Sequence, residues 1–424
     1  MGARAAANRA ISDCLRRKLP LDAVLDAAVT GLTGRDRGFA RAIANETMRR
    51  FGQLDALVRH FVPRPPPLHK AGPTLEILLA ASCELLFLSV AAHAAVDGAN
   101  RLAAADAKAV HFKPLINAVL RRIAREGAVV LRGQDEFPLN TADWLWQRWL
   151  GVYGEEVTRA VAGVHVQTPP LDLSFRAPPD SVPRDGGINL PGGMIRIAPA
   201  GNVESLPGYK DGTFWVQDFA ASLPARLFGD VAGRHVVDLC AAPGGKTAQL
   251  CASGARVTAV ERDEHRIERL QQNLARLDFA AELVLADVRD YRPQAPADCV
   301  LLDAPCSATG TVRRHPELPW IKSAADVAAC ADATVELLEA AASMVRPQGL
   351  LVFAVCSLEP EEGTEQVAYF LRRNPKFRRV PIAPQEIFGL AQCLDANGDL
   401  RTLPCHFAEN GGMDGFYAAR LLRL

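Results

Sequence analysis

From Val231 onward, short runs of apolar and β-branched residues alternate with loops and helical segments. No other feature of the chain constrains its fold as strongly, because alternating strands and helices form a parallel sheet covered by helices on both faces. The clearest helical segment, residues 264–277, repeats apolar residues at three- and four-residue spacing. We expect buried strands at residues 235–239, 257–260, 283–285, 299–302 and 350–354.

The first third of the chain has a different pattern and predicts helices throughout. It is rich in Ala, Leu and Arg and lacks the alternation typical of strands. Consecutive prolines at 65–67 interrupt the helical pattern. We expect helices at residues 9–32, 39–59, 74–90 and 114–125, and a helical connector at 140–162 with short strands at 171–175 and 194–197 after it.

The fold class predicted is therefore multidomain. An all-α bundle takes residues 1–135, a helical connector with a small α/β subdomain takes 136–218, and a Rossmann-like α/β domain takes 219–424. The 424 residues balance 48 Lys and Arg against 48 Asp and Glu. Residues 1–130, however, hold 19 basic against 11 acidic residues, and a basic first domain is suited to a polyanion.

The ten cysteines form no C-x-x-C pair, which argues against a zinc ribbon, a redox motif or a disulfide scaffold. We therefore expect reduced thiols, a cytoplasmic protein and no metal site. No uninterrupted apolar run approaches the ~20 residues of a membrane span, so we expect no membrane partner.

A glycine-containing loop, Asp238-Leu-Cys-Ala-Ala-Pro-Gly-Gly-Lys-Thr247, follows the first strand of the α/β region. Ligands of such sheets bind beyond the carboxyl ends of the strands, and Gly244 and Gly245 allow a close backbone approach. A P-loop is excluded, because Cys240 stands where its first glycine belongs, six residues before Lys246, and the spacing of a dinucleotide fingerprint is also absent.

Acids at the ends of the next strands favour a nucleoside that carries an amino acid. Glu261 is placed to bind both ribose hydroxyls, and Asp287 to bind an adenine amino group. S-adenosylmethionine has these parts. The predicted cofactor-binding residues are the loop and the acids of the strand ends: Cys240, Ala241, Ala242, Pro243, Gly244, Gly245, Lys246, Glu261, Asp287 and Asp303.

Two cysteines follow the fourth and fifth strands, Cys306 in Asp-Ala-Pro-Cys-Ser and Cys356 in Val-Cys-Ser-Leu-Glu-Pro-Glu-Glu. With the glycine loop, these motifs resemble those of the RNA cytosine-5 methyltransferases, and most closely the bacterial RsmB (Sun/Fmu) family, which modifies small-subunit (16S) ribosomal RNA. Members begin with a NusB-like helical RNA-binding domain. Three stretches resemble that domain, Glu84-Leu-Leu-Phe-Leu, His93-Ala-Ala-Val and Asn117-Ala-Val-Leu-Arg-Arg.

The resemblance implies a role for each reactive residue. Carbon 5 of cytosine is a weak nucleophile, and a thiolate that adds to carbon 6 activates it. The resemblance assigns this attack to Cys356, release of the adduct to Cys306, and binding of the base to Asp303, while Cys240 is read as structural. Three positions depart from the family pattern: Val355 for Thr, Gly363 for Asn, and Glu261 for the commoner Asp.

The implied partner is small-subunit ribosomal RNA, bound by a protein that we expect to be a monomer. Arg313, Arg314 and His315 follow the Cys306 loop and are either phosphate contacts or a solvated basic loop. Two alternatives stay open. The same chemistry on transfer RNA or DNA is disfavoured by the NusB-like domain and by Cys356, respectively. A non-catalytic RNA-binding assembly factor is disfavoured by the complete set of motifs.

Overall fold

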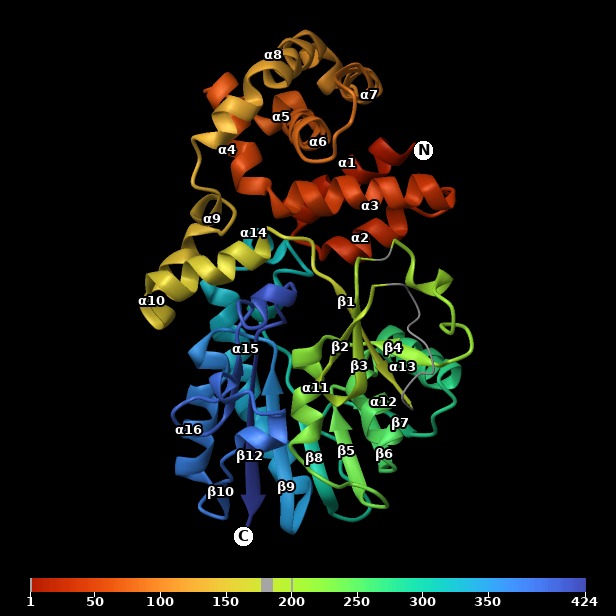
Figure 1. Ribbon diagram of the computed structural model, residues 1–424, viewed down its shortest axis with the longest axis vertical. Coiled ribbons are helices and arrows are strands. Elements are labelled where there is room, and N and C mark those ends of the chain that lie inside the picture. The colour runs from red at the N-terminus through yellow and green to blue at the C-terminus, as the bar shows by residue number, and fades with distance from the viewer. Residues whose placement is uncertain (1, 177–185, 200) are drawn as a thin grey trace. The chain divides into compact units, whose positions relative to one another are not determined.

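The computed structural model describes residues 2–176, 186–199 and 201–424 (Figure 1). The chain divides into two compact units, a helical unit 1 (Met1–Gln167 with Val312–Ser323) and an α/β unit 2 (Thr168–Thr311 with Ala324–Leu424). Unit 1 thus takes in a short segment, Val312–Ser323, that interrupts unit 2 in the sequence.

This division differs from the three domains expected, because the stretch 136–218 is shared between the two units. Its helical part is tied to unit 1, where Arg50 pairs with Glu136 at 2.6 Å. Its strands are tied to unit 2, where Asp172 accepts a hydrogen bond of 3.0 Å from the backbone N–H of Phe219 and Arg196 donates to the carbonyl of Gly412 at 2.7 Å. Buried polar contacts therefore attach the small sheet to the domain that follows it.

Unit 1 is a bundle around α6 (Thr74–Leu86), which is buried over most of its length. The predicted all-α character of this region is confirmed. The other helices are α1 (Ala3–Arg17), α2 (Leu21–Ala28), α3 (Gly34–Arg49), α4 (Phe51–Phe61), α5 (Leu68–Ala71), α7 (Ala92–Ala104), α8 (Lys113–Arg132), α9 (Glu136–Leu139), α10 (Asp143–His165) and α14 (Leu318–Ile321).

Two of the expected helices are each divided in two. Residues 9–32 do not form one helix, because Lys18 adopts φ 57° after α1 and Pro20, which has no backbone N–H, precedes α2. Residues 39–59 are divided at Arg50, whose φ and ψ of −106° and 17° are not helical. The prediction of single helices is wrong at both places, since apolar spacing alone does not reveal a bend between two amphipathic segments.

Unit 2 contains two sheets among the described residues. The smaller is antiparallel in the order β2-β3-β1-β4, and the larger has the order β10-β12-β9-β8-β5-β6-β7, with β11 paired to β12. The strands are β1 (Leu171–Phe175), β2 (Ile188–Leu190), β3 (Met194–Ile197), β4 (Phe214–Val216), β5 (His235–Leu239), β6 (Arg256–Glu261), β7 (Glu282–Leu285), β8 (Ala297–Asp303), β9 (Val345–Val355), β10 (Phe377–Arg379), β11 (Leu400–Thr402) and β12 (Phe416–Arg423). Every strand predicted in this region is present. The expected burial of residues 283–285 is wrong, however: β7 is the edge strand of the large sheet, none of its residues is buried, and Leu285 is 54% exposed.

The parallel part of the large sheet, β9-β8-β5-β6-β7, brings the carboxyl ends of these strands to one edge (Figure 1). Successive residues of β5 contribute to two different cores, Val236 to one and Val237 to the other, as expected of a sheet covered on both faces. The chain order reverses between β5 and β8, which makes their loops the place for a ligand. The helices of unit 2 are α11 (Phe219–Arg226), α12 (Gly245–Ala252), α13 (Glu264–Arg276), α15 (Ala324–Met344) and α16 (Thr364–Arg373).

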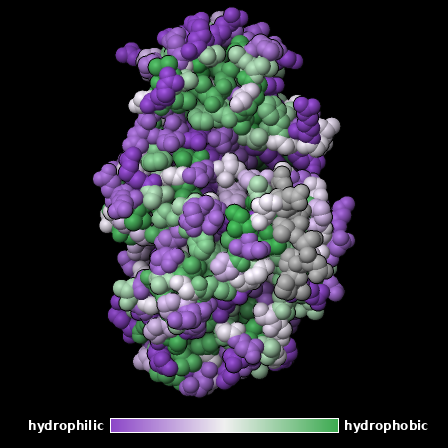
Figure 2. All heavy atoms as spheres, viewed as in Figure 1, coloured by the Kyte–Doolittle hydropathy of each residue, from purple (hydrophilic) through white to green (hydrophobic). Residues whose placement is uncertain are grey.

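The surface shown in Figure 2 intersperses hydrophilic and hydrophobic residues over the described part of the chain. Among the described helices, none is long and apolar enough to cross a membrane.

Candidate active site

The loop between β5 and α12 turns sharply at the carboxyl edge of the large sheet. Gly244 has φ 105°, and a Cβ atom there would lie 2.5 Å from Cδ1 of Leu270, so the position requires glycine. The first backbone N–H groups of α12, from Gly245 on, are available to a ligand because no earlier turn of helix uses them. Burial raises the pKa of the Cys240 thiol to about 12, which fits the structural role expected of it.

The predicted acids lie at the ends of the next two strands. Glu261, the last residue of β6, is buried and accepts hydrogen bonds from the backbone N–H groups of Arg262 (2.9 Å) and Asp263 (3.2 Å). Asp287 follows β7, and the hydrogen bond from Arg289 lowers the pKa of its carboxyl group to about 2. Asp287 is therefore an acceptor at all physiological pH values.

Asp238, in β5, is a third acid beside the loop, and it is buried. Burial raises its pKa to about 7, although Thr247 donates a hydrogen bond of 2.6 Å to its Oδ2 atom. Its Oδ1 atom is buried without a hydrogen-bond partner among the residues that the structure describes. A buried acceptor left unpaired next to a glycine loop fits the amino group of an amino-acid-bearing nucleoside. The residues present thus fit S-adenosylmethionine.

The two cysteines of the sequence motifs meet at the same sheet edge. Their Sγ atoms lie 3.5 Å apart, although the residues are far apart in the sequence. The loops that carry them are joined by a hydrogen bond of 3.0 Å from the N–H of Gly310 to the carbonyl of Cys356. The hydrogen bond with Cys356, and then burial, raise the pKa of Cys306 well above its ordinary value. Cys306 is therefore a thiol that can donate to the sulfur of Cys356.

Lys246, predicted only as part of the cofactor loop, is a cation paired with the predicted base-binding acid, Asp303. Its Nζ atom lies 2.8 Å from Oδ2 of Asp303 and 5.0 Å from the centre of the Phe416 ring. Burial alone would lower the pKa of Lys246, but the negative charges of Asp303 and of Cys356 raise it above the ordinary value. The nucleophile expected from the sequence, the base-binding acid and a cation are thus neighbours.

A buried carboxylate that the sequence analysis did not single out joins the two cysteine loops. Glu362 accepts hydrogen bonds from the N–H of Ser307 (2.7 Å), from its hydroxyl (2.5 Å), and from the hydroxyl of Ser357. Ser307 follows Cys306, and Ser357 follows Cys356. We call these three residues the Glu362 brace. The signal in the sequence was the serine that follows each cysteine, together with the second acid of Pro-Glu-Glu.

Two of the positions that depart from the family pattern, Val355 and Gly363, lie near the expected nucleophile, and the structure shows what surrounds each of them. Val355 is fully buried in the core of the sheet. A Cβ atom at Gly363 would lie 3.0 Å from a guanidinium nitrogen of Arg401 and 3.1 Å from the ring of Tyr417. Arg401 donates a hydrogen bond of 2.6 Å to the carbonyl of Ser357, so glycine leaves room for a side chain that holds the nucleophile's neighbour.

The basic residues after the Cys306 loop lie in unit 1. The Arg313 side chain is completely buried, so the prediction of a phosphate contact is wrong for this residue. Arg314 is half-buried, and His315, 41% exposed, lies 3.6 Å from Asp22. The alternative of a solvated basic loop is likewise wrong for Arg313, whereas Arg314 and His315 are partly exposed.

This arrangement defines a class of protein, the α/β methyltransferases, here with a helical unit preceding the catalytic domain. Residues 1–125 match the NusB family, and residues 228–422 match the family of the 16S rRNA methyltransferases RsmB and RsmF. The chain is 35% identical to ribosomal RNA small subunit methyltransferase B of Pseudomonas putida, over 100% of this chain and 99% of that protein. The protein of that name from Cronobacter sakazakii is 31% identical over 99% of this chain and 98% of its own.

The chain therefore belongs to the RsmB/F family of 16S rRNA methyltransferases, as its motifs predicted, and its methyl donor is S-adenosylmethionine. Solved structures show the same fold. PH0851 matches with a TM-score of 0.75 over 98% of both chains at 22% identity. A methyltransferase homologue from Pyrococcus horikoshii matches with a TM-score of 0.54 over 66% of this chain and 94% of its own, at 23% identity.

Proposed function

We propose that this protein methylates carbon 5 of a cytosine in small-subunit ribosomal RNA, through a covalent bond between Cys356 and carbon 6 of the base. The observation that carries the proposal is the contact of 3.5 Å between the Sγ atoms of Cys306 and Cys356 at the edge that also holds the glycine loop. Two thiols in contact suit a reaction in which one forms an adduct and the other assists its release.

Lys246 activates the nucleophile. A free thiol is mostly protonated at neutral pH, because its pKa is near ~8.5, and a cation close by favours the thiolate. Lys246 is held beside Asp303 by an ion pair of 2.8 Å and is influenced electrostatically by Cys356. The thiol of Cys306 stabilises the same thiolate by donating its hydrogen bond.

Asp303 and Cys306 act on the base and on its release. Asp303 accepts from the amino group of cytosine, which orients carbon 6 toward Cys356. The bond between Cys356 and carbon 6 makes carbon 5 nucleophilic. After methylation, Cys306 gives its thiol proton to the departing sulfur of Cys356 and takes up the proton of carbon 5. The double bond between carbons 5 and 6 is restored as the bond to Cys356 breaks, and both cysteines end as thiols.

The cofactor, when bound, supplies the methyl group as an electrophilic sulfonium. The glycine loop at Gly244 and Gly245 and the acids Asp238, Glu261 and Asp287 are the residues that would hold it. A target base must be turned out of its stack to reach such a site, at a cost of about a few kcal/mol. The basic excess of residues 1–130, 19 against 11, supports binding of the RNA backbone by unit 1.

The direct test is methyl transfer from labelled S-adenosylmethionine to unmodified 16S rRNA, with the product nucleoside identified by mass spectrometry. We expect 5-methylcytidine from the wild type and no turnover from C356A. C251A is a matched control, because Cys251 is a partly buried thiol that no role has been proposed for. Retained turnover in C356A contradicts the mechanism.

The same assay separates the alternative substrates and the non-catalytic reading. Methylation of transfer RNA or DNA in preference to 16S rRNA contradicts the proposed substrate. Absence of S-adenosylmethionine binding in calorimetry would support an assembly factor instead. The expected monomeric state is part of the proposal and is tested by sedimentation.

A further inference from the structure

The segment Val312–Ser323 belongs to unit 1 but begins a few residues after Cys306, which belongs to unit 2. The chain leaves unit 2 after Thr311 and returns to it at Ala324. Only residues 307–311 separate Cys306 from the start of the segment. A displacement of the segment is therefore transmitted over a very short length of chain to a residue of the proposed reaction.

The residues between Cys306 and the segment are closely packed. Gly310 is packed so closely that a Cβ atom there would lie 2.0 Å from the carbonyl oxygen of Gly415. The two glycines are also joined by a hydrogen bond of 2.8 Å from the N–H of Gly415 to the carbonyl of Gly310. Because Gly310 is closely packed and also donates a hydrogen bond to the carbonyl of Cys356, a force applied at Arg313 is passed on to the two cysteine loops and is not taken up by loosely packed chain.

Within unit 1 the segment is held by buried contacts. The carboxylate of Glu317, which is 1% exposed, accepts a hydrogen bond of 3.1 Å from the N–H of Leu21. Lys18 donates to the carbonyl of Trp320 at 2.7 Å, and the ring of Trp320 lies 4.7 Å from that of Phe51. The segment is therefore an integral part of the helical unit.

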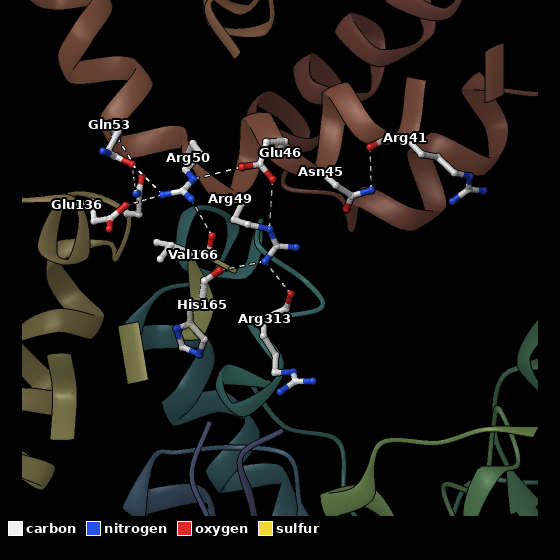
Figure 3. A network of polar contacts seen from close by, with 11 residues as sticks. Arg41, Asn45, Glu46, Arg49, Arg50, Gln53, Glu136, His165, Val166 and Arg313 are labelled. Carbon is white, nitrogen blue, oxygen red and sulfur yellow. Dashed lines mark hydrogen bonds and ion pairs between the residues drawn. The ribbon is translucent and has the colours of Figure 1, made fainter. Parts of the chain in front are cut away.

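Arg49, the last residue of α3, holds the first part of the segment (Figure 3). Its NH1 atom donates hydrogen bonds to the carbonyl of Arg313 (2.8 Å) and to the carbonyl of His165 (3.0 Å), at the end of α10. Glu46 lies 3.7 Å from its Nε atom. Burial lowers the pKa of Arg49 to about 10, so the guanidinium remains charged at neutral pH.

Hydrogen bonds from a buried charged donor are stronger than those between neutral groups, and their loss leaves buried carbonyls unpaired. The carbonyl of Arg313 belongs to the second residue of the segment. Arg49 thus fixes the point at which the chain from Cys306 enters unit 1.

We propose that Arg49 is a positioning residue of the active site, which holds the Cys306 loop in its reactive position by anchoring the carbonyl of Arg313. This inference rests on the proposed function. It makes the helical unit a part of the catalytic apparatus in addition to an RNA-binding module, since the anchor is formed within that unit.

The test compares R49M with R50M in the full-length protein. Arg50 is a matched control, because it also donates to a carbonyl after α10, that of Val166 at 3.0 Å, but has no hydrogen bond or ion pair with Val312–Ser323 in the described structure (Figure 3). Two measurements are made: the single-turnover rate of methyl transfer to 16S rRNA, and hydrogen exchange of the backbone amides.

We expect R49M to lower the single-turnover rate by about tenfold or more, because small displacements of reacting groups have effects of that size. RNA affinity should be unchanged. Hydrogen exchange should accelerate across residues 304–323 in R49M but not in R50M. R49K, which keeps a charged donor, should recover part of the rate.

The inference is overturned if R49M keeps the wild-type rate and exchange, or if R49M and R50M slow the reaction equally. If R49M does not fold, the pair E317A and E317Q replaces it, with loss of rate expected in E317A and rescue in E317Q, which keeps an acceptor for Leu21. Exchange is measured without substrate, so failure of the proposed function and failure of this inference are distinguishable.

Discussion

Replacement of Glu362 by alanine should separate the two cysteine loops and slow formation of the covalent adduct. The side chain accepts three hydrogen bonds, one of them from the backbone N–H of Ser307. The hydroxyls of Ser307 and Ser357, 3.4 Å apart, can turn toward each other and recover part of the loss. Without Glu362 the N–H of Ser307 remains buried and unpaired.

One unpaired buried donor costs about 1–3 kcal/mol, and the cavity left by the side chain adds to this. Burial raises the pKa of Glu362, which means that the charged carboxylate is itself unfavourable in this position. Its removal therefore offsets part of the lost stability. We therefore expect E362A to lose about 2 kcal/mol of unfolding free energy, or roughly 4–8 °C in the melting temperature of a unit of this size.

The assay is quenched-flow formation of the protein–RNA adduct, measured together with thermal unfolding. E365Q is the control, because Glu365 is exposed on α16 and has no hydrogen bond or ion pair with the brace in the described structure. E362A should form adduct at least ~10-fold more slowly. Wild-type adduct formation in an E362A protein that is destabilised as expected would refute the positioning role of the brace.

The brace also predicts a pH dependence. The folded state holds the proton of Glu362 more tightly than the unfolded state, whose carboxyl group titrates near 4.5. The tighter binding of this proton adds to the free energy of unfolding below that pH. The contribution is lost as the pH rises through the raised pKa of the folded state. E362Q mimics the protonated acid, so its stability relative to the wild type should increase with pH. A constant difference across that range contradicts the assignment.

Three further predictions concern single positions. K246M should reduce adduct formation by at least ~100-fold, because the thiolate of Cys356 loses its cation; adduct formation at the wild-type rate would assign activation elsewhere. The affinity for S-adenosylmethionine should weaken as the pH falls below about 7, the pKa of Asp238, because the ionised acid binds an ammonium group more strongly than the neutral acid does. D238N should abolish this pH dependence in calorimetry. G310A should unfold at lower temperature than the wild type, because its Cβ atom would lie 2.0 Å from the carbonyl oxygen of Gly415; an unchanged midpoint would contradict the close packing.

The sheet and the reactive edge were predictable because their signals are local. Each buried strand is a short apolar run, and β5 has the residues that the pattern indicated, His235–Leu239. Residues at the carboxyl ends of parallel strands share an edge whatever the order of the strands, so Cys306 and Cys356 could be placed together from the sequence.

Contacts between distant residues were not predictable in this way. Nothing near Lys246 in the sequence indicates its ion pair with Asp303, and the space for Arg401 beside Gly363 depends on strand β11. The burial of Arg313 was also missed, since a basic run is usually solvated and only the fold shows that its segment belongs to the helical unit. Such pairings are set by tertiary packing, and periodicity carries no information about them.

The transient bond from Cys356 to a cytosine of small-subunit ribosomal RNA can be trapped in a variant that forms the adduct but does not release it. C306A is incubated with S-adenosylmethionine and 16S rRNA, the complex is digested, and the cross-linked peptide and nucleotide are identified by mass spectrometry. We expect an accumulated adduct that joins Cys356 to a cytosine methylated at carbon 5. An adduct on any other residue, or turnover without any adduct in C306A, would contradict it.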